Sequence, residues 1–252
     1  MLFGLRAIGG LTSLVRMADS DSEDQTDITG FDGTGHRARL RKRLIENGGD
    51  ALLDHELIEY LLALAIPRRD TKPLAKKLLH NFGGIGALLS ADAEAIARAG
   101  PVSEGAVAAL KTAHAAALRL LRSQVADQKI LSSWEALLDY LRADMAYLIH
   151  ERVRILHLNS RNMLIRDEVM AEGSVDEAAL HVREVIRRAL DLGSSALIIV
   201  HNHPSGDPQP SKADIQLTRE IIEAGKRLGI SVHDHIIIGG KGSSSMRALG
   251  LM

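Results

Sequence analysis

The chain has 252 residues, and its 31 basic and 32 acidic side chains give a formal net charge of −1. A hydrophobic fraction of 46% and a charged fraction of 25% are typical of a soluble globular protein with one large or two ordinary domains. The absence of cysteine excludes disulfides, thiol nucleophiles and thiolate metal sites. Eleven histidines remain as candidate metal ligands, whereas the few aromatic residues argue against a base-stacking platform for single-stranded nucleic acid.

The first 35 residues carry six acidic side chains and two arginines, with almost no hydrophobic periodicity. This composition predicts a disordered acidic arm over 1–35, with Met17 as an alternative natural start. The longest apolar stretch, Leu57 to Ile66, contains Glu59 and is far shorter than the roughly 20 residues that span a bilayer. We therefore expect no membrane association and a cytoplasmic location.

Residues 36–127 have a helical pattern throughout and no strand signal. Polar residues that favour helix starts alternate with proline and glycine residues that end helices. These signals predict a helical domain over 36–127 with four short helices: Asp54 to Pro67, Asp70 to Leu79, Ser90 to Gly100 and Ser103 to Val125.

The pattern changes after Lys129, where helices and strands begin to alternate. Such alternation predicts a mixed α/β sandwich over 128–252. The expected helices are Ser132 to Ala146, Ala178 to Leu192 and Ala213 to Leu228; the expected strands are Val153 to Leu158, Met163 to Ala171, Ala196 to Val200 and Ser231 to Ile238.

The densest chemical signal is the segment 201–214, HNHPSGDPQPSKAD, which follows a short apolar strand. His201 and His203 are two residues apart on extended chain, so both rings point to the same side. The proline-rich turn that follows lets the carboxylate of Asp214 return to the same point. Two imidazoles and one carboxylate leave one tetrahedral position for water, which is the arrangement of a catalytic zinc site.

Ser211 and Asp214 also have a structural interpretation. A Ser-x-x-Asp sequence directly before an amphipathic run is a helix start, with Ser211 as N-cap and Asp214 in the first turn. The two interpretations are compatible.

The whole string HxHP…SxxD resembles the JAMM signature of the JAB/MPN metallopeptidases. Residues 151–240 are similar, almost without gaps, to the RadC family (UPF0758), long labelled as DNA repair proteins, and a weaker similarity extends back to His36. The resemblance implies an α/β fold: a C-terminal MPN (JAB-like, cytidine-deaminase-like) α/β sandwich, preceded by a small all-α domain similar to helix-hairpin-helix modules.

The JAMM resemblance also implies zinc (Zn2+) as cofactor and a glutamate from an earlier strand as proton acceptor. Four glutamates are candidates: Glu151, Glu168, Glu172 and Glu184. Glu151 heads a hydrophobic strand fifty residues before His201, which resembles the spacing in the family, so Glu151 is the choice.

The implied activity is hydrolysis of a peptide or isopeptide bond in a peptide or protein substrate. Glu151 would move the proton of the attacking water, and Ser211 would donate a hydrogen bond to the oxyanion. A second His-x-His pair, His233 and His235, has no Ser/Asp return after it; a structural hydrogen-bonding role is expected there, with support of the metal ligands as the alternative.

The helical domain carries a basic run that would contact a DNA backbone non-specifically: Arg37, Arg39, Arg41, Lys42 and Arg43. A solvated helix face is the competing interpretation. The expected hairpin at 99–105 lacks the usual Gly-apolar-Gly turn, and Glu104 stands where a phosphate would bind. Two alternative functions therefore remain open: a DNA-binding accessory protein of repair or recombination, and a catalytically silent MPN scaffold.

Overall fold

A computed structural model describes residues 33–126, 130–173 and 180–252. Residues 1–32, which make up most of the predicted acidic arm, lie outside the described residues, whereas Gly33 already begins a helix. Residues 33–252 cluster as one compact unit, so the division at 127/128 stays a prediction. None of the helices in these three ranges is both long enough and apolar enough to cross a bilayer.

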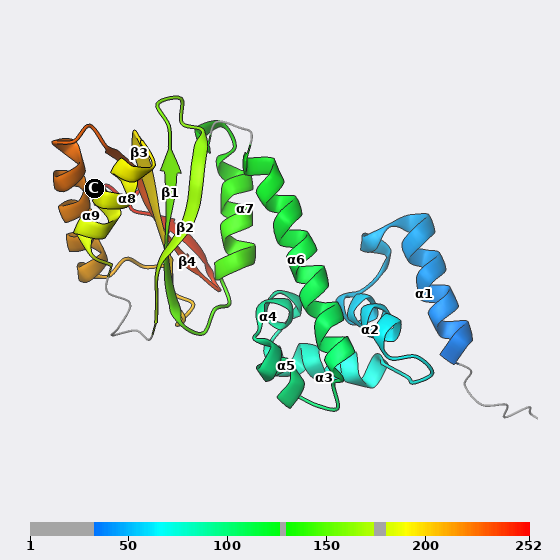
Figure 1. Cartoon of the computed structure of the whole chain (residues 1–252). Coiled ribbons are helices and arrows are strands. Elements are labelled where there is room, and N and C mark those ends of the chain that lie inside the picture. Colours follow the sequence, from blue (N-terminus) through cyan, green and yellow to red (C-terminus); the bar gives the residue numbers. More distant parts are fainter. Residues whose placement is uncertain (1–32, 127–129, 174–179) are drawn as a thin grey trace, which may run out of the picture. The chain divides into compact units, whose positions relative to one another are not determined.

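The first part of the described chain is helical, as expected (Figure 1). Its helices are α1 Gly33–Asn47, α2 Asp54–Ala65, α3 Lys72–Phe82, α4 Ile85–Ser90, α5 Ala93–Arg98 and α6 Glu104–Ala126, with a 3₁₀ turn at Gly49–Ala51. Apolar side chains from α2 to α6 form one core around Leu62 and Leu78, both fully buried. The four predicted helices correspond to α2, α3, α5 and α6.

Helices α1 and α4 were not among the predicted helices. Helix α1 is highly charged, and polar contacts do much to hold it: His36 Nε2 lies 2.9 Å from Glu59 Oε1, and Arg43 forms two hydrogen bonds to the Glu56 carboxylate. Such a helix carries little hydrophobic periodicity. Helix α4 has only six residues and directly follows two glycines with positive φ, so its sequence reads as a loop.

The second part is an α/β unit with a five-stranded sheet of order β2-β1-β3-β4-β5. Only β3 and β4 are parallel; the other neighbours are antiparallel. The elements are a 3₁₀ turn at Ile130–Ser132, α7 Trp134–Met145, β1 Glu151–Leu158, β2 Leu164–Gly173, α8 Val182–Asp191, β3 Ala196–Asn202, α9 Lys212–Lys226, β4 Ser231–Gly239 and β5 Gly242–Ser245. The α/β architecture with a helical region before it confirms the predicted fold class.

Two boundaries and one additional strand in this part correct the sequence prediction. Strand β3 continues through His201 and Asn202, because both residues pair with β4, whereas the prediction ended it at Val200. Helix α8 begins at Val182; the expected start, Ala178, lies outside the described residues. Strand β5 was missed because Gly242–Ser245 contains only glycine and serine, which have low strand propensity.

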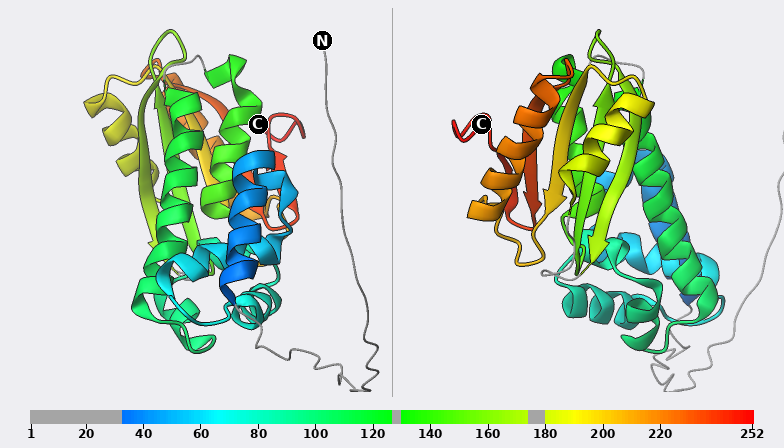
Figure 2. Two further views of the ribbon diagram at one scale, coloured as in Figure 1. Left: turned by 90° about the vertical axis from the view of Figure 1, so that its right-hand side faces the viewer. Right: turned by 60° about the vertical axis from the view of Figure 1, so that its left-hand side comes forward.

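Helix α7 covers one face of the sheet, and α8 and α9 cover the other (Figures 1 and 2). The alternation along β3 follows these two layers: Ile198 and Val200 pack toward α7, whereas Leu197 and Ile199 pack toward α8 and α9. By the same period of two, His201 faces the α9 side. The alternation of side chains along β3 thus places His201 on the face of the sheet that α9 covers.

His157 on β1 is a buried titratable group with a measurable consequence. Its side chain is inaccessible to solvent, and its Nδ1 lies 3.0 Å from Ser194 Oγ. Burial lowers the pKa of His157 to about 4, whereas an unfolded histidine has a pKa of about 6.5. Below pH 6.5 the unfolded chain therefore binds a proton that the folded chain does not, and the free energy of unfolding falls as the pH approaches 4.

We expect His157 to account for up to about 3 kcal/mol of this loss. Urea unfolding of wild type and His157→Asn between pH 7.5 and 4.5 measures the effect. Other buried histidines titrate in both proteins, so the difference between the two slopes isolates His157. An unchanged slope in the variant would show that this ring is not held neutral by the fold.

Candidate metal centre

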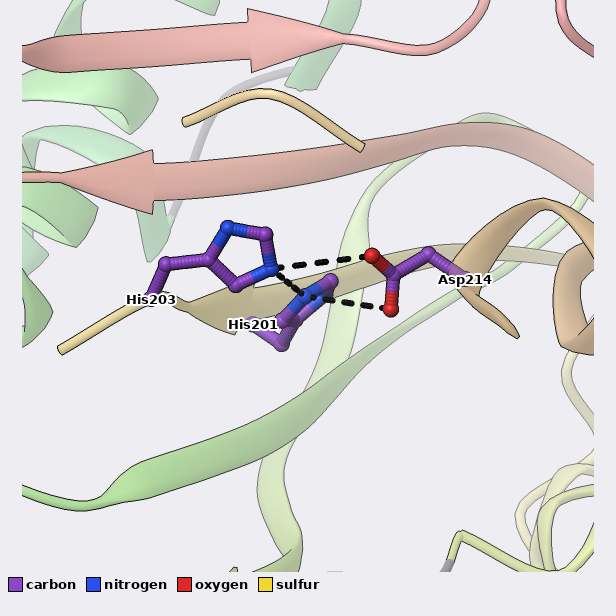
Figure 3. A group of neighbouring side chains, drawn as sticks. All are labelled: His201, His203 and Asp214. Atoms are coloured by element: carbon purple, nitrogen blue, oxygen red, sulfur yellow. Dashed lines mark hydrogen bonds and ion pairs between the residues drawn. The ribbon is translucent and has the colours of Figure 1, made fainter. Parts of the chain in front are cut away.

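Three side chains predicted as metal ligands converge at the end of β3 and the start of α9 (Figure 3). His201 Nε2 lies 2.9 Å from His203 Nε2 and 3.4 Å from Asp214 Oδ1, and His203 Nε2 lies 3.6 Å from Asp214 Oδ2. His201 is buried, while His203 and Asp214 are partly exposed. The cluster is therefore closed to solvent at His201 and open to it at His203 and Asp214.

In each of the two histidine rings, the hydrogen bond formed by Nδ1 determines whether Nε2 carries a hydrogen or a lone pair. His203 Nδ1 lies 2.8 Å from the carbonyl oxygen of Asp207, which can only accept a hydrogen bond, so Nδ1 carries the hydrogen. His201 Nδ1 lies 2.8 Å from Nε2 of His235. With a hydrogen on each Nδ1, two lone pairs face each other across 2.9 Å beside a carboxylate. Such an arrangement requires a cation between them, either a proton or a metal ion.

The electrostatics of the three groups are those of a cation site. Burial lowers the pKa of His201 to about 4, which keeps this ring neutral. The contact with the Asp214 carboxylate raises the pKa of His203, because it favours the protonated ring. Burial alone would raise the pKa of Asp214, but the contacts with His203 and with the neighbouring His201 hold it well below its usual range. A neutral imidazole and an ionised carboxylate are both ready to bind a metal.

The donor set suits zinc. Two ligand atoms that each lie about 2.0–2.1 Å from a tetrahedral zinc ion are about 3.4 Å apart. The two histidine–aspartate separations of 3.4 and 3.6 Å are close to this value. The 2.9 Å between the two nitrogens would have to widen by about half an ångström. Nitrogen and oxygen donors without sulfur, with an open side, are typical of catalytic zinc.

The first turn of α9 positions Asp214. The backbone N–H of Ser211 donates to Asp214 Oδ2 over 2.7 Å, and the backbone N–H of Asp214 donates to Ser211 Oγ over 3.1 Å. This capping box fixes the carboxylate relative to the helix start. Ser211 Oγ accepts in this bond, so its own hydrogen remains available for donation. The helix-cap interpretation of Ser211 is confirmed, and its chemical role stays a prediction.

Glu151 begins β1 at the same end of the sheet as the cluster, since Val153 pairs with His201. Its charge contributes to the raised pKa of His203, so the two residues are electrostatic neighbours. The buried side chain of Asn202 forms hydrogen bonds to the backbone on both sides of Glu151. Asn202 accepts a hydrogen bond from Arg152 N over 2.9 Å and donates one to the carbonyl oxygen of His150 over 3.0 Å.

The other three candidate glutamates pair with arginines. Glu168 accepts from Arg188 over 2.7 Å, Glu172 from Arg152 over 2.8 Å and Glu184 from Arg187 over 2.9 Å. The arginine hydrogen bond is in each case the main cause of a lowered pKa of the glutamate. A depressed pKa makes a carboxylate a weak proton acceptor at neutral pH.

The two histidines of the second His-x-His pair, His233 and His235, have different contacts and different roles. His233 Nε2 lies 2.7 Å from Asn162 Oδ1, which is a structural contact. His235 contacts His201 directly, and its other nitrogen lies 2.6 Å from Oγ1 of Thr218 on α9. Sequence reasoning missed Thr218 and Asn202. The available signals were a threonine four residues after Asp214, on the same helix face, and a polar residue inside a buried strand.

The predicted nucleic-acid residues all lie on α1. Arg37 donates to the backbone oxygens of Ile66 and Arg69, and Arg43 donates to the Glu56 carboxylate. Three basic side chains on this helix are exposed: Arg39, Arg41 and Lys42. At the start of α6, the hydroxyl of Ser103 accepts from the backbone N–H of Ala106, which places a protein cap at that helix N-terminus.

The chain matches known proteins over this same region. The family model of the RadC-like JAB domain matches residues 131–251. A curated relative from Rhodobacter capsulatus, named UPF0758 protein, is 48% identical over 213 residues, which cover 84% of this chain and 100% of that protein. That name states no activity. Because the identity is high and the relative is covered in full, the chain belongs to the RadC (UPF0758) family.

Proposed function

We propose that the protein is a zinc-dependent hydrolase of the JAMM type that cleaves a peptide or isopeptide bond. One observation carries the proposal: Nε2 of His201, Nε2 of His203 and the carboxylate oxygens of Asp214 lie 2.9–3.6 Å from one another. His201, His203 and Asp214 would hold the ion. When bound, zinc supplies Lewis acidity, which makes water a nucleophile near neutral pH and polarises a carbonyl group.

The remaining roles belong to Glu151 and Ser211. Glu151 accepts the proton from the attacking water and returns it to the leaving amine. Ser211 donates its hydroxyl hydrogen to the carbonyl oxygen as negative charge develops there. Asn202 supports this assignment, because its two backbone hydrogen bonds hold both peptide groups that flank Glu151.

The test needs no known substrate. The purified full chain, loaded with one equivalent of zinc, is incubated with a peptide library derived from a proteome, and new termini are identified by mass spectrometry. A chelator-treated sample of the same protein is the control. We expect termini that appear only with zinc. Failure to bind stoichiometric zinc, or identical termini in both samples, would contradict the proposal.

The alternative, a DNA-binding accessory protein, has less support. Arg37 and Arg43 are engaged in hydrogen bonds within the protein, so three of the five predicted residues remain exposed. A DNA affinity that falls steeply with salt and is unaffected by His201→Ala would favour this alternative.

A further inference from the structure

Behind the candidate metal ligands lies a buried chain of hydrogen bonds that begins at one ligand and ends at another. His201 Nδ1 contacts His235 Nε2 at 2.8 Å, His235 Nδ1 contacts Thr218 Oγ1 at 2.6 Å, and Thr218 Oγ1 donates to the backbone oxygen of Asp214 at 2.6 Å. All three side chains are buried, and Thr218 is fully inaccessible.

The direction of each hydrogen bond follows from counting hydrogens. Thr218 Oγ1 lies 2.6 Å from the Asp214 carbonyl oxygen, and of these two oxygens only the hydroxyl carries a hydrogen, so Thr218 is the donor. Thr218 Oγ1 therefore accepts from Nδ1–H of His235. A neutral ring carries one hydrogen, so Nε2 of His235 is an acceptor.

The same reasoning determines which nitrogen of His201, a candidate metal ligand, carries the hydrogen. Since His235 Nε2 accepts, His201 Nδ1 must donate to it. His201 then has its hydrogen on Nδ1 and its lone pair on Nε2, the atom that faces His203 and Asp214.

We propose that Thr218 and His235 are positioning residues that fix the tautomer of His201, so that its Nε2 lone pair points into the metal centre. This relay, the chain of hydrogen bonds from Thr218 through His235 to His201, rests on the proposed function, because it prepares His201 to bind zinc. The tautomers themselves do not require the metal. Hydrogen bonds to the outer nitrogen of a metal-binding histidine commonly set its tautomer and basicity. Here the hydroxyl that sets the tautomer is two side chains away from the metal centre.

Removing the hydroxyl reverses the relay. In Thr218→Val, Nδ1 of His235 loses its acceptor, so His235 favours the tautomer with the hydrogen on Nε2. That hydrogen is donated to His201 Nδ1, and the hydrogen of His201 moves to Nε2, the atom needed for zinc. Zinc binding must then overcome this preference and leave a buried N–H without an acceptor.

The experiment compares Thr218→Val with Thr218→Ser in the full chain. We expect Thr218→Val to weaken zinc binding about 10–100-fold, as is typical for outer-shell partners, and Thr218→Ser to stay close to wild type. Competition with a chelator of known zinc affinity measures the dissociation constants. A packing role predicts the opposite order, because valine preserves the buried volume and serine lacks the methyl group. Equal zinc affinity of wild type and Thr218→Val would overturn the proposal.

Nitrogen-15 NMR of the histidine rings tests the relay independently of zinc. In metal-free wild type we expect the hydrogens of His201 and His235 on Nδ1, and in Thr218→Val on Nε2. A wild-type His201 protonated on Nε2 would overturn the relay whatever the zinc affinity. The expected tautomers in a protein that binds no zinc would instead refute the proposed function and leave the relay standing.

Discussion

Glu151→Gln is expected to retain one equivalent of zinc and to slow hydrolysis by about 10²–10⁴-fold. Glutamine has almost the same shape but cannot accept the proton of the attacking water. Zinc is retained because Glu151 is not one of the three residues of the candidate metal centre. Elemental analysis of the purified variant and the rate of zinc-dependent peptide cleavage measure the two quantities separately.

Glu184→Gln is the matched control. Glu184 lies on α8 and pairs with Arg187 at the surface, so the same chemical change there should leave the rate unchanged. A Glu151→Gln variant that cleaves at the wild-type rate would remove Glu151 from the mechanism. One of the arginine-paired glutamates would then have to be reconsidered as proton acceptor.

Asp214→Ala is expected to lose stoichiometric zinc, with an affinity at least about 100-fold weaker than that of wild type, which exceeds the usual effect of outer-shell changes. The carboxylate supplies the only oxygen donor of the three-residue cluster. The same substitution removes the acceptor for the backbone N–H of Ser211, so α9 also loses part of its cap. Zinc content and stability must therefore be measured together.

Ser211→Ala separates these two effects. It removes the other half of the capping box, the bond from the backbone N–H of Asp214, at a cost of about 1 kcal/mol. The Asp214 carboxylate and its bond from the backbone N–H of Ser211 are retained. We expect this variant to keep its zinc and to hydrolyse about 10²–10³-fold more slowly, because one oxyanion donor is missing. If Asp214→Ala kept a full zinc equivalent, the ligand assignment would be wrong.

Local sequence patterns predicted the elements that depend on local physics. The helix start at Ser211 and Asp214 follows from side chains that cap their own backbone. The shared direction of His201 and His203 follows from the strand period. Their convergence with Asp214 was expected from the turn between them, and the three side chains do lie together. Their role as zinc ligands stays a proposal.

Long-range polar contacts could not be predicted in this way. Thr218 and His235 are seventeen residues apart, and Asn202 bonds to the backbone on both sides of Glu151, fifty-one positions earlier. Neither contact leaves a periodic signature, because each depends on which strands become neighbours. Helix α1 was missed for a related reason: its charged contacts, such as that of His36 with Glu59, are formed with a different helix.

Asn202, the residue between His201 and His203, has a structural role of its own. Successive residues of β3 alternate in direction, so the two histidines point toward the candidate metal centre while Asn202 between them contacts the neighbouring strand. The three residues thus have two roles: the histidines contribute two side chains of the candidate metal centre, and Asn202 holds the backbone on both sides of Glu151. An aliphatic residue at position 202 would leave these two peptide groups of β1 without their partner.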